Sequence, residues 1–204
     1  MSPTYRICHT IARLVGHLWF QHEVVHRERL MEEGPVLIVC NHVSFLDPPM
    51  VGISYRKEIW FLARKSLFRG FGAWLYPRLN VIPVDQEQPD MTGLKNIIRL
   101  LQKGESVLLF PEGSRSWDGS PQPGEPGVGL VIAKTRVPVQ PLRIFGAHSV
   151  MPRGAGLPRL GRIRIVVGHP ITFTEEERSA KGRHGYGILS DRVMQAIAAL
   201  AEPE

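Results

Sequence analysis

Residues 36–49 have the sequence VLIVCNHVSFLDPP. The first five positions form a short apolar run that is typical of a strand buried on both faces. Pro48 and Pro49 suit the first turn of a helix and disfavour helix just before them. A buried strand followed by a polar turn and a helix is the building unit of an α/β domain, so this stretch predicts the class of fold.

Other apolar runs repeat this pattern along the chain and alternate with helical segments. The predicted strands are residues 36–40, 59–62, 81–84, 107–110, 139–144 and 163–167. Buried strands that are separated by helices favour a sheet with helices on both faces. We therefore expect an α/β fold with a single mixed, largely parallel sheet flanked by helices.

Helical periodicity is clearest between residues 94 and 101, where apolar residues recur at i, i+3, i+4 and i+7. Asp90 is placed to cap this helix and Gly104 to end it. A last helix is predicted over residues 188–200. Residues 118–129 are rich in glycine and proline and therefore predict a loop.

The first thirty residues predict an N-terminal amphipathic helix. Its apolar stripe consists of Ile7, Ile11, Leu14, Val15 and Leu18, with Trp19 and Phe20 beside it. Basic residues lie on the other faces, so the helix suits a membrane interface. Packing of the same stripe on the core of the domain is the alternative. We expect residues 1–30 to form this helical region and residues 31–204 to form one domain.

Composition limits the classes of partner. The 204-residue chain is 43% hydrophobic and carries a formal net charge of +6, which fits a packed domain with an anionic partner. The basic residues are scattered and form no recognised motif, so a nucleic-acid partner is not expected. With only Cys8 and Cys40, a disulfide framework is not expected either, and a reducing compartment fits better. Apolar runs fall short of the roughly 18 residues of a membrane span, and the N-terminus lacks the cleavage site of a signal peptide.

His42 and Asp47 form the first candidate catalytic pair. Five residues of α-helix rotate by about 140°, so the two side chains can meet only across a turn. Asp47 would then accept a hydrogen bond from one imidazole nitrogen and leave the other nitrogen as a general base. Asn41 is a turn residue or an orienting donor. Ser44 is expected to stabilise the turn, because no Gly-x-Ser-x-Gly surrounds it. The alternative is a buried histidine held by an ordinary polar partner.

A second polar cluster, FPEGSRS, occupies residues 110–116 and follows another apolar run. Pro111 and Gly113 predict a turn, and turns at the carboxyl ends of strands hold the ligands of open α/β sheets. Gly113 permits close approach of a substrate, and Arg115 offers a planar fork that matches phosphate. Glu112 is placed to bind a substrate hydroxyl or to hold Arg115. A polar surface loop with an ion pair is the alternative.

Together the two clusters resemble the motifs of the lysophosphatidate (1-acylglycerol-3-phosphate) acyltransferase family. That family carries Asn-His-x-x-x-x-Asp first and Phe-Pro-Glu-Gly-Thr-Arg-Ser later, and this chain differs in the second motif only at Ser114. Residues 81–85, 137–141 and 168–171 are similar to its further blocks, so the likeness covers about residues 34–172. The family's intermediate block usually ends in arginine, whereas this chain has Gln86 there. Arg64 and Lys65 follow another predicted strand and are placed to supply positive charge.

The resemblance implies an O-acyltransferase in which His42 deprotonates the acceptor hydroxyl, which attacks an acyl thioester directly. Asp47 would orient His42, and an amide of the turn would stabilise the oxyanion. The substrate-binding residues that it implies are Asn41, Arg64, Lys65, Glu112, Gly113, Ser114 and Arg115. It implies no cofactor and no metal. The co-substrate would be acyl-CoA or an acyl-carrier-protein thioester, and the acceptor a lysophospholipid, most directly 1-acyl-glycerol-3-phosphate, at the cytoplasmic face of a membrane.

Three other functions fit parts of the sequence. His22-Glu23-Val24-Val25-His26 matches H-E-x-x-H, which on a helix would place both imidazoles on one face for zinc. A zinc peptidase is disfavoured because few residues precede this motif and no third histidine follows it. A thioester or lysolipid hydrolase would use the same His42 with water as the nucleophile. A lipid-binding module without catalysis is the third alternative.

Overall fold

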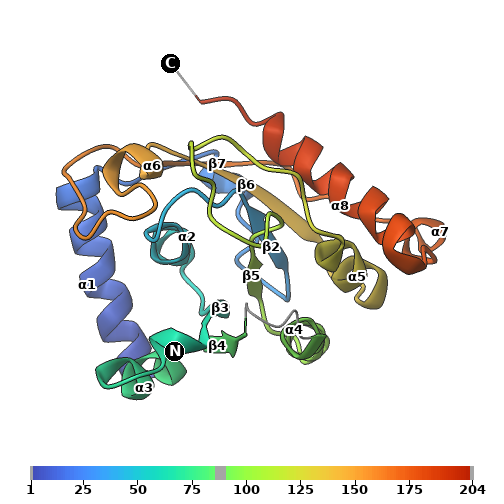
Figure 1. Cartoon of the computed structure of the whole chain (residues 1–204), viewed down its shortest axis with the longest axis horizontal. Coiled ribbons are helices and arrows are strands. Elements are labelled where there is room, and N and C mark those ends of the chain that lie inside the picture. Colours follow the sequence, from blue (N-terminus) through green and yellow to red (C-terminus); the bar gives the residue numbers. More distant parts are fainter. Residues whose placement is uncertain (1, 86–90, 203–204) are drawn as a thin grey trace.

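The computed structural model describes residues 2–85 and 91–202. Gln86 and the predicted helix cap Asp90 lie outside the described residues. The described chain forms an α/β fold in which helices cover both faces of a mixed, mostly parallel sheet (Figure 1).

The main sheet has five strands in the order β1-β7-β6-β2-β5. Their bounds are β1 (Glu23–Val25), β2 (Leu37–Cys40), β5 (Val107–Leu109), β6 (Val139–Phe145) and β7 (Arg164–Val167). Only β6 and β7 pair antiparallel. A parallel pair, β3 (Phe61–Arg64) and β4 (Val81–Val84), adjoins β5 through a bridge between Trp60 and Val107. The strands that carry the two polar clusters, β2 and β5, are therefore neighbours with the same direction.

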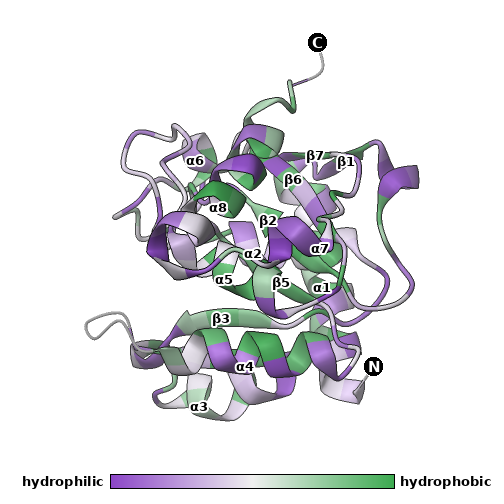
Figure 2. Ribbon diagram, turned by 90° about the vertical axis from the view of Figure 1, so that its right-hand side faces the viewer, coloured by the Kyte–Doolittle hydropathy of each residue, from purple (hydrophilic) through white to green (hydrophobic). Residues whose placement is uncertain are grey.

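The central strand β2 separates two hydrophobic cores, because alternate side chains of a strand point to opposite faces. Ile38 and Cys40 join the core beneath α1 and α2, whereas Leu37 and Val39 join the core beneath α4, α5 and α8. The longer helices are α1 (Pro3–Phe20), α2 (Asp47–Ser54), α4 (Met91–Gln102), α5 (Pro126–Lys134) and α8 (Gly182–Ala198). The shorter ones are α3 (Phe71–Leu75), α6 (Ala147–Val150), α7 (Glu175–Arg178) and the 3-10 turns η1 (Arg27–Arg29), η2 (Lys65–Leu67) and η3 (Tyr76–Leu79). The ribbon of α4 alternates between apolar and polar segments, as its periodicity predicts (Figure 2).

Several predicted boundaries are wrong for local reasons. The N-terminal helix ends at Phe20, where Gln21 takes a left-handed conformation, and the chain then adds β1 to the edge of the sheet beside β7. The predicted loop ends early, because Pro126 starts α5 and suits its first turn. The last helix begins at Gly182, before the predicted start.

Helix α1 packs on the domain through a face other than its apolar stripe. Its buried residues are Tyr5, Gly16 and Phe20, and it contacts α2. Gly16 permits this approach, since a β-carbon there would lie 2.6 Å from Ile53 Cδ1. Most of the stripe points outward, with Ile7, Ile11, Leu14 and Leu18 exposed by 57–66%. Packing on the core therefore does not account for the stripe. None of the helices in residues 2–85 and 91–202 has both the length and the apolar character to cross a bilayer.

Candidate functional site

The turn between β2 and α2 brings His42 and Asp47 into direct contact. His42 Nδ1 lies 2.8 Å from Asp47 Oδ2, and the same oxygen accepts hydrogen bonds of 2.7 Å from the backbone N–H groups of Val43 and Ser44. Asp47 is fully buried, and the His42 side chain is 17% exposed. The carboxylate also lies in the first turn of α2, where the helix dipole favours negative charge. A meeting across a turn is the predicted geometry.

The imidazole of His42 is held on its edge and on one ring face. Asp47 Oδ2 is an acceptor, so in the neutral imidazole this contact favours the tautomer with the proton on Nδ1 and the lone pair on Nε2. The ring of Phe110 stacks on the imidazole with centroids 3.9 Å apart and planes 14° apart. Phe110 begins the second polar cluster, so the two clusters meet at this ring. The arrangement presents one basic nitrogen in a fixed orientation.

Glu112 joins the two clusters through their backbones. Its Oε1 accepts a 2.8 Å hydrogen bond from the His42 N–H, and its Oε2 accepts one of 3.1 Å from the Gln122 N–H. The N–H of Ser116 in turn donates to the His42 carbonyl oxygen at 2.8 Å. Burial is the main reason that the pKa of Glu112 rises to about 7. The carboxyl group therefore fixes the backbone of His42, and it bonds to these amides rather than to the Arg115 side chain.

Asn41 and Ser44 anchor the His42 turn to neighbouring segments. The amide group of Asn41 donates to the Ile144 carbonyl oxygen at 3.1 Å and accepts from the Ile144 N–H at 2.8 Å, which pins the turn to β6. Ser44 Oγ donates to the Met151 carbonyl oxygen at 2.8 Å and accepts from the Leu46 N–H. Both side chains are buried. Ser44 thus stabilises the turn, as predicted.

The second cluster is more open. Gly113 has a φ of +68°, a left-handed conformation that favours glycine, and Gly113 and Ser114 are exposed. The pKa of the half-buried Arg115 is lowered, first by burial and then by the positive charges of Arg153 and Arg64, whereas Asp47 raises it. The turn that carries Arg115 is joined to the His42 turn by the hydrogen bond from the Ser116 N–H to the His42 carbonyl oxygen.

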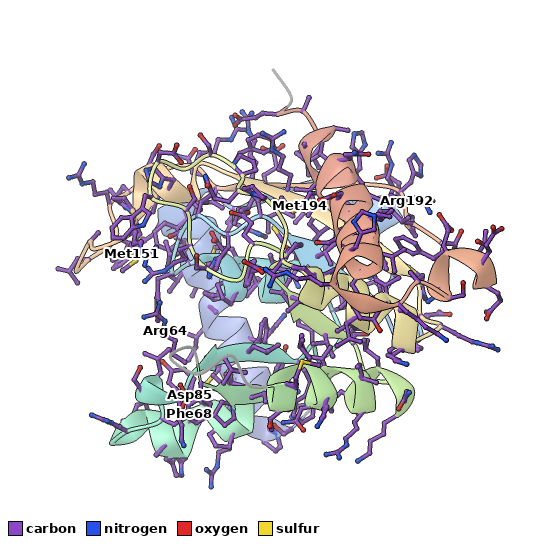
Figure 3. The ribbon with its side chains drawn as sticks, turned by 45° about the vertical axis from the view of Figure 1, so that its right-hand side comes forward. Arg64, Phe68, Asp85, Met151, Arg192 and Met194 are labelled. Atoms are coloured by element: carbon purple, nitrogen blue, oxygen red, sulfur yellow. The ribbon has the colours of Figure 1, made fainter. Side chains whose placement is uncertain are left out.

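Arg64 and Lys65, the two cationic residues predicted to follow a strand, differ in their relation to Arg115. Arg64 ends β3 and acts on the pKa of Arg115 through its charge. Figure 3 shows its side chain on the same side of the molecule as Met151. Lys65 starts the short turn η2 and is exposed. Of these two residues, Arg64 is the one whose charge acts on Arg115.

Arg153 is a further residue of this region that was not predicted from the sequence. Its Nη1 donates a 2.8 Å hydrogen bond to the carbonyl oxygen of Arg115, and its guanidinium lies 3.8 Å from the centroid of the Trp117 ring. Arg153 follows α6, 38 residues along the chain from Arg115. No local pattern marks it, because only the path of β6 and α6 brings it to the site.

The H-E-x-x-H pattern, which was disfavoured as a zinc site, does not lie on a helix as that alternative required. Its residues leave the helix after Phe20: Glu23 belongs to β1, and His26 has a left-handed conformation before η1. His22 bonds to Ser54 Oγ, and burial lowers its pKa to about 4. Throughout residues 2–85 and 91–202, no cluster of three or more His, Cys, Asp or Glu side chains is arranged to hold a metal ion.

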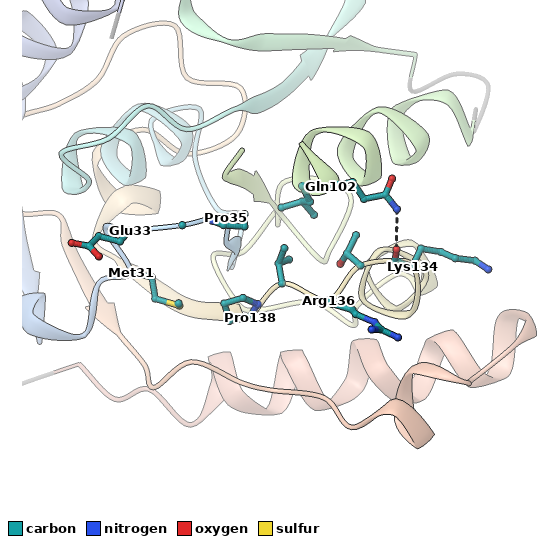
Figure 4. Close-up of a pocket in the computed structure, with 11 residues that line it drawn as sticks. Met31, Glu33, Pro35, Gln102, Lys134, Arg136 and Pro138 are labelled. Carbon is teal, nitrogen blue, oxygen red and sulfur yellow. Dashed lines mark hydrogen bonds between the residues drawn. The ribbon is translucent and has the colours of Figure 1, made fainter. Parts of the chain in front are cut away.

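An open pocket of about 650 Å³ lies away from these clusters (Figure 4). Its lining includes Pro35 and Pro138, which precede β2 and β6, and a bond from Gln102 Nε2 to the Lys134 carbonyl oxygen closes one side. The pocket therefore adjoins the amino ends of the strands, whereas His42 follows the carboxyl end of β2. It is not part of the candidate site.

The site thus consists of an imidazole whose Nδ1 contacts a buried carboxylate, beside a turn that carries a cationic side chain. Residues 21–145, more than half of the chain, match the family model described as Acyltransferase. This range contains both polar clusters, and the chain belongs to this acyltransferase family.

Individual relatives agree with that assignment. A chloroplastic 1-acyl-sn-glycerol-3-phosphate acyltransferase of Brassica napus, BAT2, is 34% identical over 68% of this chain and 41% of its own length. The chain spans about two fifths of the chloroplastic relatives it matches. A 1-acyl-sn-glycerol-3-phosphate acyltransferase of Bacillus subtilis is 26% identical over 82% of each chain. The crystal structure of the LPA acyltransferase PlsC from Thermotoga maritima has the same fold, with a TM-score of 0.72, 23% identity, and coverage of 98% of this chain and 83% of that one.

Proposed function

We propose that the protein transfers a fatty acyl group from an acyl thioester to the free hydroxyl of 1-acyl-glycerol-3-phosphate, giving phosphatidate. The observation that carries this proposal is the 2.8 Å contact between His42 Nδ1 and Asp47 Oδ2 beside the Arg115 turn. Membership of the acyltransferase family supports the reaction type, and the names of the relatives support the acceptor.

In the proposed reaction, His42 Nε2 takes the proton of the acceptor hydroxyl as its oxygen attacks the thioester carbonyl. The new C–O bond forms and the C–S bond breaks. The imidazolium then gives its proton to the departing sulfur, which leaves as the thiol, and His42 Nε2 regains its lone pair. Asp47 keeps the required tautomer and stabilises the positive ring. General-base catalysis contributes roughly 10²–10⁴-fold. No acyl-enzyme intermediate is needed, so Ser44 remains a residue that stabilises the turn.

The acceptor phosphate is proposed to bind at the second cluster. Arg115 supplies a fork that matches phosphate, Arg64 and Lys65 add charge, and the exposed Gly113 and Ser114 leave the backbone accessible. Glu112 and Asn41 support binding indirectly, because their side chains bond to backbone groups that hold the two turns.

We place the protein at the cytoplasmic face of a membrane as a peripheral enzyme, with the region of residues 1–30 at the interface and residues 31–204 as the catalytic domain. The support is the exposed apolar stripe of α1, together with Phe71 and Trp74 of α3, which are 73% and 49% exposed. Apolar patches of this kind, with basic residues beside them, suit an anionic lipid surface. The acyl donor is acyl-CoA or an acyl-carrier-protein thioester.

The test supplies purified protein with a labelled acyl thioester in the presence and absence of 1-acyl-glycerol-3-phosphate. Labelled phosphatidate should form only with the acceptor, and His42→Ala should abolish it while circular dichroism remains that of a folded protein. Equal release of free fatty acid without acceptor would instead identify a hydrolase. Lipid binding without any turnover by the wild type would identify a binding module.

A further inference from the structure

Three arginines from separate segments contribute positive charge around the turn after β5, and two of them, Arg115 and Arg153, are in direct contact. Arg64 ends β3, Arg115 lies in the turn after β5, and Arg153 follows α6. Arg153 is bonded to the backbone of Arg115, and the charges of Arg153 and Arg64 both lower the pKa of Arg115, after burial. Within the described parts of the chain, none of the three forms a salt bridge with a carboxylate. Positive charge without a direct salt-bridge partner suits a multiply charged anion.

Arg153 is held in place on two sides. Its Nη1 donates to the Arg115 carbonyl oxygen at 2.8 Å, and the ring of Trp117 lies 3.8 Å from its guanidinium carbon. Two residues earlier, the Met151 carbonyl oxygen accepts from Ser44 Oγ at 2.8 Å. The loop that carries Arg153 is therefore fixed to the His42 turn as well as to the Arg115 turn.

The contacts of Arg153 use only part of its guanidinium. One N–H is bound to the carbonyl oxygen of Arg115 and one face lies on Trp117, so further N–H groups remain for a ligand. A planar fork can bind a backbone carbonyl and a phosphate oxygen in one plane, whereas a lysine ammonium is a point charge with no such fork.

We infer that Arg153 is a positioning and specificity-determining residue: it fixes the backbone of Arg115 and makes the acceptor site prefer a phosphomonoester headgroup over an uncharged one. This inference rests on the proposed function. It predicts that the residue acts on the choice and affinity of the acceptor and leaves the chemistry at His42 unchanged.

The test compares the full chain with Arg153→Gln, which keeps an N–H donor without the charge, and with Arg153→Lys, which keeps the charge without the fork. Arg159→Gln is the matched control, because Arg159 is an exposed arginine of the same loop. Each protein is assayed in uncharged detergent micelles with 1-acyl-glycerol-3-phosphate and with 1-acyl-glycerol, which offers a hydroxyl without the phosphate.

Arg153→Gln should raise KM for the phosphate acceptor roughly 10- to 100-fold, as expected for a lost bond to a charged group, with little change in kcat. Turnover of 1-acyl-glycerol should stay at the wild-type level, so the preference between the acceptors falls by the same factor. Arg153→Lys should retain the salt dependence of KM but only part of the affinity, and Arg159→Gln should behave as the wild type.

Equal losses on both acceptors, or unchanged KM and preference, would overturn the inference. If circular dichroism shows that Arg153→Gln does not fold, the test uses Arg153→Lys instead. An unchanged preference of that variant for 1-acyl-glycerol-3-phosphate over 1-acyl-glycerol would then overturn the inference. A wild type that acylates neither acceptor would contradict the proposed function itself, which is a separate outcome.

Discussion

The turns after β2 and β5 follow neighbouring parallel strands, yet they are built in opposite ways. In the first, Asn41, Ser44 and Asp47 are almost fully buried, and each bonds to backbone groups. In the second, Gly113 and Ser114 are exposed and Arg115 is half-buried beside like charges. The first turn fixes one nitrogen in space, whereas the second exposes cationic groups to a ligand. Under the proposed function, this difference would separate a preorganised base from a surface that selects the substrate.

The largest expected effect on kcat comes from Asp47→Asn, which removes the carboxylate of the first turn without leaving a cavity. Asp47→Asn keeps the side-chain size but replaces one carboxylate oxygen by an N–H₂ group, so the tautomer and charge of His42 are no longer fixed. We expect kcat to fall about 10²–10⁴-fold, measured as phosphatidate formed by protein whose circular dichroism is unchanged. Near wild-type kcat would show that the contact between His42 and Asp47 is structural only.

An intermediate effect is expected from the second turn. Arg115→Ala should raise KM for 1-acyl-glycerol-3-phosphate roughly 10- to 100-fold, because a charge-assisted bond to phosphate is lost, and should change kcat little. Initial rates over a range of acceptor concentrations separate the two constants. A fall in kcat with an unchanged KM would assign Arg115 to the chemical step. The two turns would then no longer divide into one for catalysis and one for substrate binding.

Glu112, which joins the turns, should make stability depend on pH. The pKa of this carboxyl is about 7 in the folded protein and ordinarily 4.5, so the folded state holds a proton that the unfolded state has lost between these values. The free energy of unfolding should therefore fall as pH rises from about 4.5 through about 7. Urea unfolding at several pH values should show this slope in the wild type and a flatter one in Glu112→Gln. Parallel slopes would show that Glu112 does not titrate there.

The smallest expected effect is on membrane binding and concerns helix α1, which lies outside both turns. Ile11→Ser on the exposed stripe of α1 should weaken binding to vesicles that contain anionic lipid, roughly 3- to 10-fold, since part of one apolar side chain is lost from the interface. Ile188→Ser is the control, because Ile188 is similarly exposed, at 58%, on α8. Equal losses in both variants would argue against an interfacial role of α1, and neither should alter turnover in detergent micelles.

Sequence patterns predicted the parts of the fold that depend on local chemistry. The buried run of β2 and the prolines of α2 placed the His42 turn, and the strand before Pro111 placed the second turn. The edge strand β1 was missed, because a three-residue strand has too little period to distinguish it from the preceding helix. Arg153 could not be predicted, since its role depends on the course of β6 and α6 and not on its neighbours in sequence.

The backbone of His42 is hydrogen-bonded on both sides of its Cα by one segment: Glu112 accepts from the His42 N–H, and the Ser116 N–H donates to the His42 carbonyl oxygen. Local opening of that segment would therefore remove two of the hydrogen bonds that position His42. Under the proposed function, a molecule in which the acceptor-binding turn has opened would also have a misplaced His42. Such a molecule would not activate water to hydrolyse the acyl thioester. Under that function, these two hydrogen bonds would link the protection of the acyl thioester against hydrolysis to the folded state of the acceptor-binding turn.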